Sequence, residues 1–488
     1  MLIKYLGALL VLLCASVDSQ LQSRVIELRT DHFNPLSTSR FDARYLENSE
    51  HYQSGGPIFI YISDSEEVDS QFILSGAMWE IARDVGGHLF ALEHRYYGES
   101  LPTEDTSVDN LRWLTIHQSL ADIAQFVAFV RANYEGAINS RVILWGRGYG
   151  GALATWARQK YPNAVDGVWA SSARINAITE FPEFMSNTFH TINSIGGPEC
   201  GDVLHEAFRF IENAVRLRDT EFIEQRLNLC SPINVDLEED VASLMYKIAE
   251  DIGYVFVTNA RYPEIDEKCF IIRGVDAPEN PAENAFEAFA RWYVDDFRNS
   301  LGDECLDREE SFLENIEWNT NATRTGRRQS LWMLCTQLGG FAVANEGENH
   351  PFGWRFDINF FRQRCGQIFN QELFTQSFME QSIADTNTLY GGLRPAVYRV
   401  FFTHGEMDPQ RNLGPNEDLN ANSPAVVMSL QSFGRDFGSP DETDYVVLQQ
   451  TKARARELIM QWLVDAAEEI PTEPPSETTT VGGPEPAE

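Results

Sequence analysis

The segment Gly146-Arg147-Gly148-Tyr149-Gly150 has the spacing of the G-x-S-x-G turn, which presents a nucleophilic serine between a strand and a helix. In that turn, small flanking residues let the strand and the helix approach closely, and the central residue is strained. The centre here is Gly148, which tolerates a positive φ without a Cβ penalty. The pattern predicts a turn suited to acyl transfer that has lost its nucleophile. A glycine-rich turn of another origin is the alternative.

Alternating strands and helices are predicted around this turn. Apolar runs bounded by turn residues predict buried strands, and apolar residues at helical spacing predict helices. The expected strands are 56–62, 87–93, 141–145, 165–171, 396–403 and 425–430, and the expected helices are 117–134, 151–161 and 449–466. This rhythm is typical of an α/β fold in which helices cover a parallel sheet.

Composition divides the chain into five segments. Residues 1–19 resemble a secretory signal peptide, with an N-terminal anchor as the alternative. Residues 20–185 and 386–468 carry the βα pattern, whereas residues 186–385 are mostly helical. Residues 469–488 are rich in Pro, Thr and Glu and predict a disordered tail. No later segment is apolar for long enough to predict a membrane span.

Charge and cysteine content narrow the class of protein. A formal charge of −35 argues against nucleic acid and anionic membranes as partners, because both would be repelled. Six cysteines follow the proposed signal peptide and predict three disulfides, for which fifteen connectivities are open. No Cys/His cluster has zinc spacing, so no metal is expected. Asn321 begins an N-glycosylation sequon.

Five blocks resemble, in order, motifs of the serine carboxypeptidase family that contains lysosomal Pro-X carboxypeptidase, dipeptidyl peptidase II and thymus-specific serine protease. They are Glu93–Ser100 (EHRYYGES), Leu114–Asp122, Trp145–Gly151, Ala170–Ala173 and Gly405–Pro409. The resemblance extends from about Val25 to Leu463. It implies an α/β-hydrolase fold with an inserted, disulfide-bonded helical cap, and cleavage next to proline by Ser, Asp and His without a cofactor. It also implies a homodimer and the disulfides Cys200–Cys269, Cys230–Cys305 and Cys335–Cys365.

The catalytic triad carried over from these motifs is incomplete. Gly148 stands at the nucleophile position, Asp408 at the acid position and Phe433 at the histidine position. In this fold the histidine follows the acid along the chain, and none of the nine histidines lies after Asp408. Ser171 and Ser172 match a structural motif and are not expected to replace the nucleophile. Asp408 is then expected to be a turn acid held by backbone N–H groups.

The region that would stabilise an oxyanion also departs from the family. It comprises Tyr149, which follows the nucleophile position, together with Ser63 and Asp64, which stand where the family has a glycine-rich stretch. A carboxylate there would oppose the developing negative charge. We also expect Phe433 and Arg147 to fill part of the former active-site space, with Phe433 within about 10 Å of Gly148.

Three functions are compatible with these residues. The leading hypothesis is a secreted pseudoenzyme that binds a proline-containing peptide or an extracellular protein partner. The alternatives are an active serine-type carboxypeptidase or dipeptidyl peptidase acting next to proline, and an extracellular structural or interaction protein. A lysosomal location is also compatible with the family. An apolar cleft would favour the first function over the third, and a cleft filled by Phe433 and Arg147 would favour the third.

Overall fold

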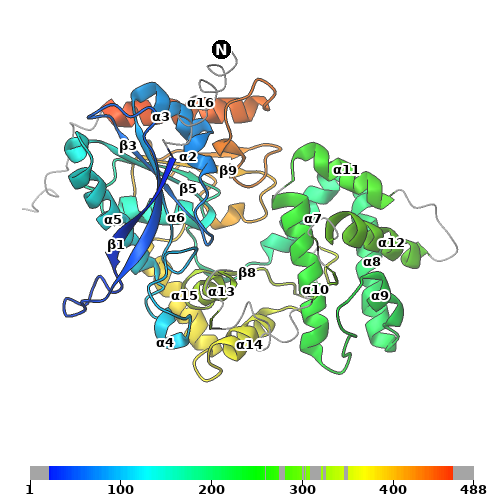
Figure 1. Ribbon diagram of the computed structural model, residues 1–488. Helices are drawn as coiled ribbons and strands as arrows, with labels where there is room; N and C mark the ends of the chain where they lie inside the picture. The colour runs from blue at the N-terminus through cyan, green and yellow to red at the C-terminus, as the bar shows by residue number, and fades with distance from the viewer. Residues whose placement is uncertain are drawn as a thin grey trace, which may run out of the picture.

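The computed structural model describes residues 21–258, 260–273, 281–298, 302, 304–307, 320–321, 326–345 and 350–464. The proposed signal peptide (1–19) and the proposed disordered tail (469–488) lie outside the described residues. Figure 1 shows a lobe that contains the large sheet and, beside it, a lobe made mostly of helices. Within the described ranges, no helix has the length and apolar content that crossing a membrane requires.

An eight-stranded sheet forms the centre of the first lobe, in the order β1-β2-β4-β3-β5-β6-β9-β10 (Figure 1). The strands are β1 (Leu21–Arg29), β2 (Arg40–Asn48), β3 (Ile58–Ile62), β4 (His88–Leu92), β5 (Val142–Arg147), β6 (Gly167–Ser171), β9 (Val400–Gly405) and β10 (Ala425–Met428). From β4 to β10 every strand is parallel to its neighbours within that run, which confirms the expected α/β-hydrolase sheet. The antiparallel β1–β2 hairpin was not predicted, because charged residues interrupt its apolar ones.

Helices cover both faces of the sheet because its central strands are buried on both sides. The helices of this lobe are α2 (Gln71–Leu74), α3 (Ala77–Val85), α4 (Val108–Leu111), α5 (Ile116–Asn133), α6 (Gly148–Lys160) and α16 (Val446–Val464). On one face Ile60 and Leu144 belong to a core shared with α5 and α6. On the other face Phe59 and Trp145 belong to a core shared with α3 and α16. Side-chain alternation along the strands thus builds two cores from one sheet.

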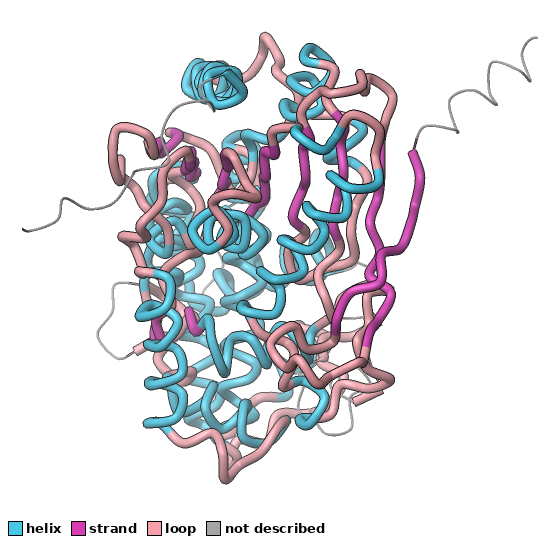
Figure 2. Tube along the Cα trace, turned by 90° about the vertical axis from the view of Figure 1, so that its left-hand side faces the viewer, coloured by secondary structure: helices cyan, strands magenta, loops and turns pink. Residues whose placement is uncertain are grey.

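The chain between β6 and β9 forms the helical lobe. Because β6 and β9 are neighbours in the sheet, this segment is an insertion. Its helices are α7 (Glu183–Gly196), α8 (Pro198–Leu217), α9 (Glu221–Arg226), α10 (Glu238–Ile252), η2 (Gly253–Thr258), α11 (Tyr262–Arg273), α12 (Pro281–Arg291), η3 (Trp292–Arg298), α13 (Arg327–Met333), η6 (Leu334–Leu338), α14 (Ile358–Ile368) and α15 (Gln376–Tyr390). Two short strands, β7 (Ile178–Glu180) and β8 (Gly339–Phe341), pair within the insertion. In the perpendicular view of Figure 2, the long strands lie on one side of the molecule and helices fill the other. The proposed domain boundaries after residues 185 and 385 fall inside α7 and α15.

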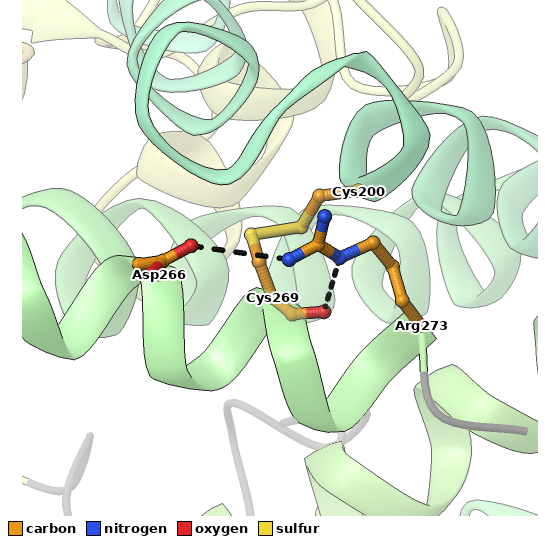
Figure 3. Close-up of a disulfide and its surroundings, with 4 residues drawn as sticks. All are labelled: Cys200, Asp266, Cys269 and Arg273. Atoms are coloured by element: carbon orange, nitrogen blue, oxygen red, sulfur yellow. Dashed lines mark hydrogen bonds and ion pairs between the residues drawn. A yellow bond between two sulfur atoms is a disulfide. The ribbon is translucent and has the colours of Figure 1, made fainter.

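Three disulfides cross-link residues within the insertion. They join Cys200 to Cys269, Cys230 to Cys305 and Cys335 to Cys365, the pairs that the family resemblance implies. The first links α8 to α11, and Nε of Arg273 donates to the carbonyl oxygen of Cys269 at 3.2 Å (Figure 3). A Cβ on Gly196 would lie 2.1 Å from Sγ of Cys269, so only glycine lets the end of α7 approach this bond.

Candidate functional site

The turn between β5 and α6 has the backbone of a nucleophile elbow. Gly148 is the first residue of α6 and has a φ of +54°. A Cβ on Gly146 would lie 2.6 Å from the carbonyl carbon of Gly150, and one on Gly150 would lie 2.4 Å from the carbonyl oxygen of Ile62. The glycines therefore permit the close strand–helix approach that the sequence pattern predicted, and the tip of the turn carries no side chain.

The space that a side chain on Gly148 would occupy is already filled. A Cβ there would lie 2.5 Å from Oδ2 of Asp64 and 3.0 Å from Cζ of Phe433. The predicted proximity of Phe433 to Gly148 is therefore confirmed. The guanidinium of Arg147 lies 5.8 Å from the ring centre of Phe433 and 5.1 Å from that of Phe72, within or near cation–π range. A larger residue at position 148 would have to displace Asp64 or Phe433.

The carboxylate of Asp64 binds the backbone N–H of Tyr149, the residue that follows Gly148 at the tip of the turn. Oδ2 accepts from the N–H of Tyr149 at 3.0 Å, and Oδ1 accepts from the N–H of Ser65 at 2.7 Å. In acyl-transfer enzymes of this fold, the N–H after the nucleophile stabilises the oxyanion. Here that donor already binds a carboxylate. Ser63 is buried, and its hydroxyl has no hydrogen-bond partner among the described residues.

The side chain of Tyr149 lies in a buried polar network beside the turn. Its hydroxyl is 3.3 Å from Nε2 of His94, which also lies 3.0 Å from the hydroxyl of Ser119. Nδ1 of His94 lies 2.7 Å from the carbonyl oxygen of Arg95. Burial lowers the pKa of His94 to about 4, so the ring is neutral at neutral pH. With both ring nitrogens engaged, His94 fits a structural role better than that of a general base.

Asp408, at the acid position, is buried just after β9. Oδ1 accepts from the N–H of Gln410 at 2.9 Å, and Oδ2 has no partner in the described part of the chain. Burial raises the pKa of Asp408 to about 6, against the lowering effect of the hydrogen bond from the Gln410 N–H. The structure thus shows the predicted backbone hydrogen bond at one carboxylate oxygen and leaves the other unpaired.

Ser171 and Ser172 both have structural partners. The hydroxyl of Ser171 donates to Oδ1 of Asp436 at 2.5 Å, and the hydroxyl of Thr403 donates to Oδ2 of the same carboxylate at 2.5 Å. The hydroxyl of Ser172 accepts from the N–H of Gly434 at 3.2 Å. None of the described bonds pairs either serine with a histidine. These contacts support the prediction that neither serine replaces the nucleophile.

The buried side chains of His404 and Asp408 should give the free energy of unfolding two opposing pH dependences. The pKa of Asp408 is raised from 3.8 to about 6, so its contribution to stability is lost as pH rises through that interval. The pKa of His404 is lowered by burial from 6.5 to about 4, so its contribution is lost as pH falls through that interval. Each effect amounts to about 3 kcal/mol, because one pKa unit corresponds to about 1.4 kcal/mol.

Urea denaturation at several pH values between 4 and about 6.5 checks this prediction. Relative to the native protein, Asp408→Asn should gain stability as pH rises, and His404→Gln should lose it. Profiles of the two variants that run parallel to that of the native protein would contradict the prediction.

The sequence also led to expectations about metal binding and about glycosylation at Asn321. Among the described residues, no group of His, Cys, Asp and Glu side chains could hold a metal ion. Asn321 is described and exposed. Its glycosylation stays a prediction.

Sequence reasoning missed two arginines beside the turn. The N–H of Arg174 donates to the carbonyl oxygen of Gly148 at 3.4 Å, and Arg435 follows the Phe433-Gly434 segment. For Arg174 a signal was present, because the A-S-S-A block resembles a motif that continues with proline. For Arg435 none was available, because its place beside the turn depends on tertiary contacts.

A family model and several relatives match most of this chain. The model of the family described as serine carboxypeptidase S28 matches residues 28–455. Thymus-specific serine protease of Mus musculus is 27% identical over 451 residues, which are 90% of this chain and 87% of that protein. Lysosomal Pro-X carboxypeptidase of Bos taurus is 27% identical over 469 residues, covering 91% of this chain and 88% of that protein. The crystal structure of proline iminopeptidase from Mycobacterium smegmatis matches 92% of this chain and 100% of its own, with 12% identity and a TM-score of 0.35.

Proposed function

Because this chain belongs to the serine carboxypeptidase S28 family, we propose that it is a secreted, non-catalytic member that binds a peptide or protein partner. The observation that carries the proposal is that Asp64 and Phe433 fill the space at the tip of the β5–α6 turn. Gly148 offers no nucleophile, and the carboxylate of Asp64 takes the N–H of Tyr149 that would stabilise an oxyanion. Covalent catalysis needs a nucleophile, a base and oxyanion donors, and all three are compromised at this turn.

An active carboxypeptidase or dipeptidyl peptidase is the first alternative. The acid position is retained as Asp408, which favours it. Against it, Phe433 lies where the resemblance places the histidine, beside the tip of the turn. The two buried histidines nearest in sequence to the five motif blocks, His94 and His404, each have a pKa of about 4, below the range useful to a general base at neutral pH.

An extracellular structural or interaction protein is the second alternative. Phe433 and Arg147 do border the tip of the turn, as this alternative requires. A pocket of about 550 Å³ nevertheless lies beside them, within the usual size range of ligand sites. The size of this space beside Arg147 and Phe433 supports a binding role, although its wall is more polar than the apolar cleft expected from the sequence.

Secretion is inferred from residues 1–19 together with the three disulfides, which fit an oxidising secretory or lysosomal compartment. A lysosomal location is the alternative, since relatives include the lysosomal Pro-X carboxypeptidases. A homodimer and binding of proline-containing peptides stay predictions from the family resemblance.

Two assays test the proposal. One measures hydrolysis of short peptides that carry proline second from the N-terminus or second from the C-terminus, and the other measures labelling by a fluorophosphonate that reacts with activated serines. The native protein should show no labelling, and its turnover should be at least about 10⁴-fold below that of an S28 peptidase with an intact triad. Bovine Pro-X carboxypeptidase assayed in parallel serves as the positive control. Turnover that persists through re-purification would overturn the proposal and identify the chain as a peptidase with another nucleophile.

A further inference from the structure

An arginine lies at or after the carboxyl end of each of four neighbouring parallel strands. Arg147 ends β5, Arg174 follows β6, Arg411 follows β9 and Arg435 follows β10. The carboxyl ends of parallel strands lie at one edge of the sheet, the edge at which open α/β sheets bind ligands. The whole chain has 38 basic and 73 acidic residues, so this row of cations runs against its composition.

A pocket of about 550 Å³ lies at this edge and is termed here the arginine pocket. Its wall includes Arg147 and Arg435 from the sheet lobe, Arg261 from the helical lobe, and the side chains of Phe433 and Phe437. A second pocket of about 320 Å³ shares Arg261 and Arg435 with it. The two pockets therefore share these two arginines, and their walls combine cationic and aromatic side chains with the carboxylates of Asp441 and Asp444.

Ion pairs already satisfy part of this positive charge. Lys452, also in the wall, binds Asp444 at 2.6 Å. Arg147 binds Glu66 at 3.1 Å and Arg261 binds Glu264 at 2.6 Å.

Of the other strand-end arginines, Arg411 donates to the carbonyl oxygen of Glu406, and the guanidiniums of Arg174 and Arg435 remain available for a ligand. Arg435 is exposed and Arg174 is partly buried, and neither makes an ion pair with any described residue. The backbones that carry them are close to the turn and to each other. The N–H of Arg174 bonds to Gly148, and the N–H of Gly434 bonds to the hydroxyl of Ser172. The backbones of Arg174 and Gly434-Arg435 therefore lie near the altered elbow. Neither guanidinium makes an ion pair within the described chain, although, against the effect of burial, the charge of Arg174 lowers the pKa of the buried Asp408 carboxyl.

Carboxylates are the partners that this arrangement fits best, because guanidinium and carboxylate form bidentate, charge-assisted hydrogen bonds. A long polyanion is disfavoured, since a chain of net charge −35 would repel it beyond the pocket. A short acidic segment presents its charge only where the arginines are, and its backbone and side chains can pack on the aromatic wall.

We propose that this cleft binds an acidic peptide segment whose carboxylates pair with Arg435 in the arginine pocket and with Arg174 on the other side of the elbow. The inference rests on the proposed non-catalytic binding function and adds the chemical class of the partner. It does not depend on proline in the ligand.

Fluorescence anisotropy with the full-length protein tests it. The probes are fluorescein-labelled hexaglutamate and, as the neutral match, hexaglutamine. At low salt the native protein should bind hexaglutamate at least about tenfold more tightly, and added salt should weaken that binding. The variant Arg174→Gln/Arg435→Gln should lose at least about tenfold in affinity for hexaglutamate. The variant Arg209→Gln/Arg454→Gln removes the same charge from two exposed surface pairs and should stay within about threefold of native.

Several outcomes would overturn the inference: equal affinity for both peptides, equal losses in the two variants, or tighter binding of a sulfated heparin hexasaccharide than of hexaglutamate. Its failure is distinguishable from failure of the proposed function. Absent hexaglutamate binding in a protein that also lacks turnover would overturn the acidic-peptide inference alone. Hexaglutamate binding by a protein with genuine peptidase turnover would support the inference and overturn the non-catalytic function.

Discussion

The triple variant Gly148→Ser/Phe433→His/Asp64→Gly is expected to react with a fluorophosphonate, whereas the double variant that retains Asp64 is not. A Cβ at position 148 would lie 2.5 Å from Oδ2 of Asp64, so a serine there meets the carboxylate before any substrate does. The same carboxylate occupies the N–H of Tyr149. Glycine at position 64 removes the obstruction and frees the oxyanion donor together.

The expected gain from Asp64→Gly is at least about 100-fold in labelling rate over the double variant, the effect typical of an oxyanion donor. Rates of fluorophosphonate labelling measure it, with hydrolysis of a proline-containing peptide as the second readout. The buried Asp408 would orient the introduced imidazole, so adding Asp408→Asn to the triple variant should lower its rate by about 10⁴-fold.

Two results would contradict this reading of the elbow. Equal labelling of the double and triple variants would show that Asp64 is no obstacle. A triple variant that melts at the native temperature yet stays unlabelled would show that Phe433 does not stand at the histidine position. Serine at a φ of +54° carries a backbone strain of about 1 kcal/mol, so melting temperatures of all variants are needed for comparison.

Replacing Arg95 by methionine should lower the free energy of unfolding by about 3–5 kcal/mol. The Arg95 side chain has no exposed surface, and its guanidinium binds both oxygens of Asp122, at 2.6 and 2.8 Å. It also donates to the backbone carbonyls of Arg29, Thr30 and Trp113. Removing it leaves His32 as the remaining side-chain partner of the buried Asp122 carboxylate and takes a donor from three carbonyl oxygens.

The pKa of Asp122 reflects the same contacts. Burial raises it, but the Arg95 charge and its hydrogen bonds, with those of His32, hold it below the ordinary value. Denaturation followed by tryptophan fluorescence measures the loss, and Arg95→Met/Asp122→Leu should lose less than the two single variants together, because no buried charge is left unpaired. The control Arg209→Met disrupts an exposed pair and should change stability by less than about 1 kcal/mol. If Arg95→Met and the control lowered the free energy of unfolding equally, the Arg95–Asp122 ion pair would make no special contribution to stability.

The EHRYYGES block, which carried much of the family resemblance, turns out to build the framework around the site. Glu93 accepts hydrogen bonds from the N–H groups of Val68, Glu99 and Ser100, and Arg95 joins the block to α5 through Asp122. Such a block is recognisable from sequence because its eight residues are consecutive. The structural role of the block could not be recognised from sequence, because Asp122 lies 27 residues away from Arg95.

Sequence alone determined the parallel sheet, the helical insertion, the elbow and the absence of a histidine after Asp408, because these depend on local patterns and on order along the chain. Through the family resemblance, it also determined the disulfide pairs and the contact of Phe433 with the elbow. Only the tertiary structure decided that Asp64 occupies the N–H of Tyr149 and that the backbones of Arg174 and Arg435 lie near the turn. Asp64, Arg174 and Arg435 follow β3, β6 and β10, strands far apart in sequence whose carboxyl ends the parallel sheet gathers at one edge.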